Sequence, residues 1–370
     1  MNQPAVSFAL PIVSAARWDV AEDAQGQQRL NLRLGVSVYN PSDARPEGLR
    51  VWFEEMPGGA APGGRTWTDP GAAAAPSPAT YEVGRFPLTT SATVDVLGQQ
   101  FRTFTQAPLR VGVSSQFSGA AATAAAVTPA VVLDRRGADP VVDGSLGEWS
   151  GNEAIADGRL VRMHDRPAIQ AGAARWTDDR PQAFAAWTAE GLYVAVRFEG
   201  APPPSGAVVR ATRNFVDTEY RRVWGEDACE LLIQPVWLDR GDPTDGPLLH
   251  VVCKPDGAFA RRRGDRRASA ELWRNFESGM RYAATTDAAG VWRAEVLIPW
   301  SALRGEGMTL EQMARLGEVP AMLRFNLSHH DGQTGRSASW AGPVDYGREE
   351  DFTGALVLRR PDRVGFGRRE

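Results

Sequence analysis

Apolar and polar residues alternate over a long stretch near the start of the chain. Leucine and valine occupy every second position from Leu30 to Val38, and the pattern returns from Leu49 to Phe53. A period of two places the apolar side chains on one face of an extended strand. No segment before residue 120 has a sustained helical period. Short strands separated by turns rich in glycine, proline, asparagine and aspartate predict a β-sandwich here.

The region after residue 137 is also dominated by expected strands. A strand over 192–198 follows a Glu-Gly turn at 190–191, which indicates a hairpin with the strand before it. Further strands are expected over 228–235, 248–253, 291–298, 322–327 and 355–358. One short helix is expected over 309–316, where Thr309 and Gln312 occupy the two positions of a capping box.

Length and composition favour more than one domain. The 370 residues exceed the usual size of a single domain, and a hydrophobic content of 43% is sufficient for ordinary cores. The alanine-rich segment Gly119 to Pro129 is the best boundary. We therefore expect an all-β protein with two antiparallel β-sandwich domains, at 1–118 and 137–358, an Ala-rich linker at 119–136 and an arginine-rich tail at 359–370. The role of the first domain is left open.

Charge and motif searches exclude several classes of function. A net charge of −4 gives no electrostatic footprint for nucleic acid. No stretch reaches the roughly 18 apolar residues that a membrane helix needs. Met1 to Val20 lacks the basic start of a secretory signal, so a cytoplasmic location is expected unless the chain is processed or exported otherwise. Nucleophile-elbow, zinc-protease, Walker and Rossmann motifs are all missing, which favours recognition over catalysis.

Histidine and cysteine are scarce, and their positions are informative. His329 and His330 are neighbours on an expected strand, where adjacent side chains face opposite ways, so the pair is not expected to bind one metal ion. Cys229 and Cys253 lie on two strands that are expected to be neighbours. The sequence leaves open whether they form a single disulfide or remain two buried thiols.

The densest basic run, 261–267, is expected to form a loop between two strands. Such a loop could dock on an anionic surface or a partner protein, and a solvated hairpin tip is the alternative. The candidate docking residues are Arg261, Arg262, Arg263, Arg266 and Arg267.

Five motifs follow one another in the second region. They are DGSLGEW at 143–149, AAW at 185–187 with GLYVAV at 191–196, WGEDACELLI at 224–233, WRAEVLIPW at 292–300, and RFNL at 324–327 with SW at 339–340. In this order they resemble the family 9 carbohydrate-binding modules and their DOMON-like relatives. The resemblance implies an antiparallel β-sandwich over about 137–358 and says nothing about residues 1–135. Most of its tryptophans are expected in the core: Trp149, Trp187, Trp292, Trp300 and Trp340.

The resemblance also implies a site. In sugar-binding members two aromatic side chains sandwich a sugar, and the matching positions here are Trp224 and Tyr346. His250 falls near the position of an arginine in the family, so the polar set is only partly kept, and His250 and Asn326 complete the candidate ligand-binding residues. Calcium often supports such modules, and its candidate ligands are Asp143 and Glu148.

Two functions are therefore expected to compete. The first is carbohydrate binding through the aromatic clamp in the second sandwich, without catalysis. The alternative is a structural or docking accessory subunit of a larger protein assembly, which could associate with a membrane through its partner, and in which the sugar site is lost. A third class, an enzyme or a haem-binding DOMON-like relative, lacks an evident pair of ligands among the histidines and methionines.

Overall fold

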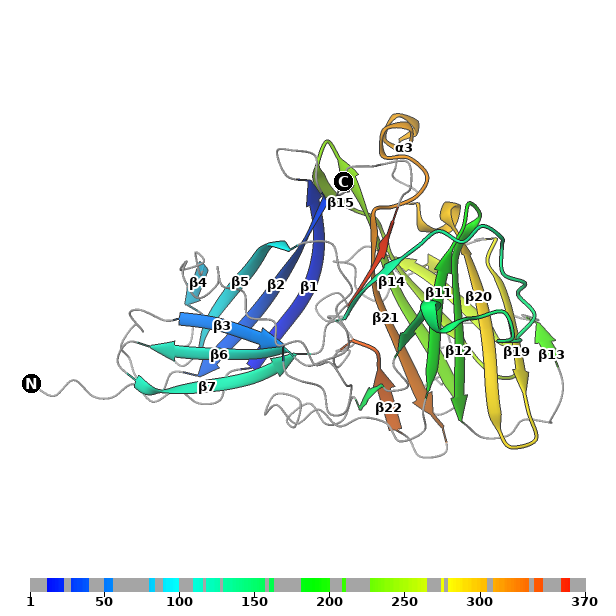
Figure 1. Cartoon of the computed structure of the whole chain (residues 1–370), viewed down its shortest axis with the longest axis horizontal. Coiled ribbons are helices and arrows are strands. Elements are labelled where there is room, and N and C mark those ends of the chain that lie inside the picture. Colours follow the sequence, from blue (N-terminus) through cyan, green and yellow to red (C-terminus); the bar gives the residue numbers. More distant parts are fainter. Residues whose placement is uncertain are drawn as a thin grey trace, which may run out of the picture.

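Figure 1 shows the chain as a computed structural model built mainly of β-strands. The expected all-β class is confirmed. No helix in the described part of the chain is long and apolar enough to cross a membrane. The structure describes residues 12–22, 28–39, 50–55, 80–83, 89–99, 109–115, 118–126, 129–156, 160–162, 181–199, 208–210, 227–264, 274–275, 279–304, 309–332, 336–341 and 354–359.

The strands up to residue 126 form two antiparallel sheets. The first has the order β1-β2-β5-β4 and the second the order β3-β6-β7. Contacts between β1 and β7 bring the two sheets together. The alternating segment that begins at Leu30 lies in β2, which pairs with both β1 and β5. The bounds are β1 Ile12–Glu22, β2 Gln28–Tyr39, β3 Arg50–Glu55, β4 Thr80–Val83, β5 Thr89–Gln99, β6 Leu109–Ser115 and β7 Ser118–Ala126.

A ten-stranded sheet lies in the second region. Its main order is β10-β22-β21-β14-β16-β17-β18, with β15 paired to β14 and β23 joining β21 to β8. Among its described pairs only β8 and β23 are parallel. The bounds are β8 Ala130–Leu133, β10 Val161–Arg162, β14 Ala228–Asp239, β15 Asp242–Asp245, β16 Leu248–Cys253, β17 Phe259–Gly264, β18 Arg274–Asn275, β21 Met322–Asp331, β22 Arg336–Ser339 and β23 Gly354–Leu358.

A six-stranded antiparallel sheet, of order β13-β19-β20-β12-β11-β9, faces the ten-stranded sheet. One core fills the space between them, where Leu231 and Phe325 of one sheet meet Val194 and Trp292 of the other. The bounds are β9 Ala154–Ala156, β11 Gln182–Trp187, β12 Gly191–Glu199, β13 Val208–Arg210, β19 Arg281–Thr286 and β20 Val291–Pro299. Short 3-10 turns, η1 at Gly151–Glu153 and η5 at Trp300–Leu303, complete this part.

The motif tryptophans pack as expected, with one exception. Trp292 is fully buried, and three others are buried and donate their indole N–H to a backbone carbonyl of another segment. These donors are Trp187 to Leu133, Trp300 to Thr188 and Trp340 to Ile155, over 2.7–3.0 Å. Each ring thus supplies core volume and also anchors a second segment of the chain. The exception is Trp149, which is partly exposed.

The hairpin and the short helix that the sequence predicted are both present. The expected hairpin is present, and Gly191 is required there because a Cβ would lie 2.3 Å from the carbonyl oxygen of Ile298. The helix α3 spans Leu310–Leu316. Its capping box is formed as predicted: Thr309 N–H donates to Gln312, and Gln312 N–H donates to the Thr309 hydroxyl.

Two segments differ from the expectation. The stretch 119–136 contains strands: β7 pairs with β6, and β8 adds to the ten-stranded sheet beside β23. Alanine-rich sequence can pair in this way because the ladder is made by backbone groups. The first arginines of the basic run, 261–263, lie within β17 and not in a loop. Three consecutive arginines hide the alternation that would reveal a strand.

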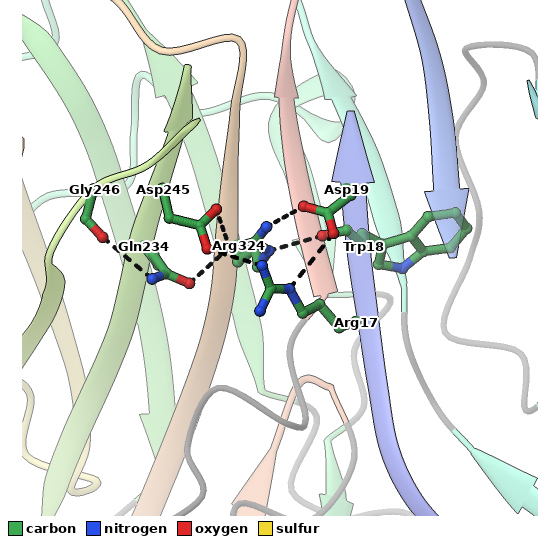
Figure 2. Close-up of polar contacts among 7 residues, drawn as sticks. All are labelled: Arg17, Trp18, Asp19, Gln234, Asp245, Gly246 and Arg324. Atoms are coloured by element: carbon green, nitrogen blue, oxygen red, sulfur yellow. Dashed lines mark hydrogen bonds and ion pairs between the residues drawn. The ribbon is translucent and has the colours of Figure 1, made fainter. Parts of the chain in front are cut away.

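A fully buried arginine joins the first region to the second. Arg324 on β21 is 0% exposed, and its Nε donates to the carbonyl of Trp18 on β1 over 2.8 Å. Figure 2 shows the guanidinium between Asp19 of β1 and Asp245 of β15, to both of which it is ion-paired. Gln234 accepts a further hydrogen bond, over 2.7 Å. All three guanidinium nitrogens are therefore used, which is what burial of a charge requires.

We predict that the variant Arg324→Ala is destabilised by roughly 3–5 kcal/mol, because two carboxylates would be left without their buried partner. Urea unfolding followed by tryptophan fluorescence measures this. Arg359→Ala is the matched control, since the ion pair of Arg359 with Asp134 is exposed, and its loss should cost less than about 1 kcal/mol. Equal losses in the two variants would contradict a special role for the buried arginine.

The two cysteines are opposite each other and unpaired. Cys229 on β14 is the direct cross-strand partner of Cys253 on β16, and both are free thiols buried in the core. Burial raises the pKa of both thiols, because the thiolate is poorly solvated there. Of the two alternatives that the sequence left open, the structure has the buried thiols.

We predict that neither thiol reacts with Ellman's reagent at pH 8 in the folded protein, since the thiolate is the reacting form. Both should react once the chain is unfolded in guanidinium chloride. Absence of titratable thiol in the unfolded, unreduced protein would show instead that the pair is oxidised.

Candidate binding face

The outer face of the ten-stranded sheet is polar although it is buried. In β14 the side chains of Leu231 and Ile233 point into the core, so Glu230 and Gln234, one position away, point outward. The same alternation applies along β16 and β21. Buried polar side chains on β14, β16 and β21 of this face include Glu230, Gln234, His250, Arg324, Asn326, Ser328 and His330. Burial of so many polar groups requires that they bind one another or the backbone.

Glu230 is the centre of this face. One carboxylate oxygen lies 3.1 Å from Nε2 of His250, on β16, and the other lies 3.0 Å from Nε2 of His330, on β21. Burial alone would raise the pKa of Glu230, which is 1% exposed, but the hydrogen bonds and charges of the two imidazoles lower it. The carboxylate is therefore held ionised at neutral pH.

His329 points in the opposite direction, as the alternation predicted. Its ring stacks on Phe198 in the core, with centroids 4.1 Å apart and planes inclined by 4°. Burial, assisted by the charge of His330, lowers the pKa of His329 to about 3. The two adjacent imidazoles thus belong to different environments. Among the residues that the structure describes, no group of three or more His, Cys, Asp or Glu side chains could hold a metal ion.

Two of the four candidate ligand-binding residues lie on this face. His250 and Asn326 are the two cross-strand neighbours of Leu232, on either side of β14. His250 binds Glu230, whereas the side-chain amide of Asn326 exchanges two hydrogen bonds with the backbone of Ala341, over 2.7 and 2.9 Å. Asn326 thus fixes the segment that follows β22. The two aromatic candidates, Trp224 and Tyr346, lie outside the described residues.

The two calcium candidates bind their own loop. An Asp143 carboxylate oxygen accepts the N–H of Ser145 over 2.8 Å, and one of Glu148 accepts the N–H of Val141 over 2.7 Å. A second oxygen of Glu148 lies 3.6 Å from the guanidinium of Arg136. These contacts close the loop at 141–149 and leave its acidic groups in separate hydrogen bonds.

A buried glutamate anchors the same loop to the six-stranded sheet. Glu295 on β20 accepts the backbone N–H groups of Asp143 and Gly144 and the indole N–H of Trp149, over 2.7–2.9 Å. Gly144 has a φ of +81°, which favours glycine. Burial raises the pKa of Glu295 in spite of these hydrogen bonds. The DGSLGEW and WRAEVLIPW motifs are therefore two parts of one structural unit.

The candidate docking arginines are held within the fold where the structure describes them. Arg261 lies over the ring of Phe259, 5.7 Å from its centroid, and Arg263 donates to the carbonyl of Arg304 over 2.8 Å. Arg262 is paired in register with His250, in the strand next to it. Arg266 and Arg267 lie outside the described residues.

Sequence reasoning missed Glu230 and His330 as members of a site. The signal was present, because Glu230 is the single charged residue in the apolar run from Ala228 to Ile233. A charge in the middle of a buried strand calls for partners, and the register of three strands supplies them. Neither partner could be found from its spacing along the chain. His250 and His330 lie on β16 and β21, and only the strand order places these two strands on either side of β14.

We predict that His329→Leu reduces the acid sensitivity of the fold. The folded-state pKa of His329 lies below its unfolded value, so its contribution to stability is complete above pH 6.5 and is lost as the pH falls toward 3. The loss is about 1 kcal/mol per pH unit. Guanidinium unfolding at pH 7, 6 and 5 measures it, with His250→Gln as a control that keeps the core ring. Parallel pH profiles of wild type and His329→Leu would contradict the assignment.

Comparison with known proteins finds likeness only among solved structures. No protein-family model matches the chain, and no curated protein matches it. The structure is similar to a family 9 carbohydrate-binding module from Caldicellulosiruptor kristjanssonii in complex with cellotriose, at 13% identity and a TM-score of 0.34, over 64% of this chain and 97% of that one. The same module type from that organism in complex with glucose is similar at 13% identity and a TM-score of 0.32, over 64% and 99%. At these TM-scores the likeness assigns neither a family nor a ligand to this chain.

Proposed function

We propose that the chain is a carbohydrate-binding protein, and that its binding face is the outer face of the ten-stranded sheet around Glu230 and His250. The observation that carries this proposal is the ionised carboxylate with an imidazole on each oxygen, set on a sheet face. Sugar hydroxyls both donate and accept hydrogen bonds, and their recognition uses a few fixed polar groups beside an apolar or aromatic surface.

Small buried side chains lie beside Glu230 on this face. Ala228, Val252, Ala258 and Ala260 form an apolar cluster that adjoins Glu230, because Val252 is its direct cross-strand neighbour. In the sequence, Trp224 stands four residues before Ala228, the first residue of β14. The proposal assigns to Trp224 and Tyr346 the role of aromatic walls on which the C–H face of a pyranose packs.

The docking-subunit alternative has less support from the described residues. It requires arginines that are available to a partner, whereas Arg261 and Arg263 contact Phe259 and the backbone of Arg304. Those contacts close the edge of the sandwich. A partner would have to be held by other groups.

We predict that a glycan array identifies at least one bound carbohydrate, and that Trp224→Ala and Tyr346→Ala each weaken binding about tenfold through loss of stacking. Isothermal titration with the identified glycan measures the dissociation constants. Ser301→Ala, an exposed position on η5, is the control and should bind as the wild type does. His250→Ala should weaken binding as well, since it removes a polar group from the proposed face.

The docking alternative makes the opposite prediction. A native pull-down would then recover a stoichiometric, salt-resistant protein complex. The glycan array would be blank, and both aromatic substitutions would leave that complex intact.

A further inference from the structure

Three side chains from three strands form a series of close polar contacts on the outer face. Ser337 on β22 lies directly opposite His330 on β21, and its Oγ is 2.6 Å from Nδ1 of the imidazole. Nε2 of the same ring lies 3.0 Å from Glu230 on β14. Glu230 is buried at one end of the series, whereas Ser337 at the other end is partly exposed. Of the three residues, Ser337 is therefore the most accessible to a reagent.

The carboxylate determines where the proton of His330 sits. An ionised carboxylate can only accept hydrogen bonds, so the nitrogen that faces Glu230 must carry the proton. In the neutral ring the other nitrogen, Nδ1, is then an acceptor. Its contact with Ser337 is consequently an O–H···N hydrogen bond in which the serine donates. This is the arrangement that prepares a hydroxyl to lose its proton.

His250 strengthens this arrangement from the other side. Its Nε2 lies 3.1 Å from the second oxygen of Glu230, so the carboxylate is held at both oxygens and is fixed in orientation. Glu230 and His250 act through His330, and we class both as positioning residues.

We propose that Ser337 is an activated nucleophile that accepts the acyl group of a carboxylic ester. The order nucleophile, imidazole, carboxylate has the roles of a serine-hydrolase triad, with the two ring nitrogens exchanged. This reactivity goes beyond the proposed carbohydrate binding and does not depend on it. Local motifs could not reveal it, because the three residues come from separate strands and meet only through the register.

The reaction balances with groups that are present and water. The Oγ of Ser337 forms a bond to the carbonyl carbon of the ester, and its proton passes to Nδ1 of His330. The bond from that carbon to the alkoxy oxygen breaks, and the alcohol leaves with the proton from His330. Water then attacks the acyl-serine by the same proton route, releasing the carboxylic acid and restoring the hydroxyl.

The test is covalent labelling of the folded full-length protein with an alkyl fluorophosphonate, which phosphonylates activated serines with loss of fluoride. We expect one adduct, placed on Ser337 by peptide mass spectrometry, and none on the protein after unfolding. Ser337→Ala should lose the label, whereas Ser301→Ala, which removes an exposed serine elsewhere, should keep it. Hydrolysis of p-nitrophenyl acetate should disappear in Ser337→Ala.

Two further variants separate activation from simple exposure. His330→Ala should slow labelling at least about 100-fold, the usual contribution of a general base. Glu230→Gln should slow it at least about tenfold, because the ring would lose its orienting charge. The thermal midpoint of each variant reports whether it folds. If the variants at the buried positions His330 and Glu230 do not fold, the labelling of Ser337→Ala, at a partly exposed site, still tests the proposal. No adduct on Ser337 in the folded wild type, or an equal rate in folded His330→Ala, would overturn the proposal.

Discussion

The burial of one positive charge determines how the two parts of this chain meet. A guanidinium without water requires a partner for each nitrogen, and Arg324 finds them in β1 as well as in its own sandwich. Arg17 on β1 adds a second positive charge, 2.9 Å from Asp245. Two arginines and two aspartates therefore neutralise one another across the junction. The amide N–H of Glu22 extends the contact along β1 by donating to the carbonyl of Gly241.

The same rule governs the rest of the outer face. The buried charged side chains there bind partners on neighbouring strands. Arg324 binds Gln234 at one end of the face, and Glu230 binds two imidazoles further along β14. Because such groups are costly to bury alone, the register of β14, β16 and β21 is fixed by polar contacts on one side and by core packing on the other. A shift of the register by one residue would turn the apolar side chains outward and the polar side chains into the core.

The sequence predicted the fold better than the site, for physical reasons. Alternation reports burial on one face, so β2, β16 and β20 were located closely from apolar residues alone. β1 was missed, because Arg17 and Asp19 make the segment look polar, although Trp18 and Val20, which alternate with them, are buried. For Glu230, His250 and His330, nothing in the sequence indicated that the three side chains meet. Their meeting depends on strand order, which local patterns do not encode.

The pairing of β8 with β23 has a consequence for the order in which the fold can close. The strand that begins the second sandwich, Ala130–Leu133, pairs with Gly354–Leu358, which is synthesised after every other described strand of that sandwich. Asp19 and Arg324, which join β1 to β21, are likewise separated by 305 residues. The strand β1 can pair with β2 early, but its junction with the second sandwich has to wait for β21, and β8 has to wait for β23. A nascent chain that stops before β23 would leave β8 without its partner strand.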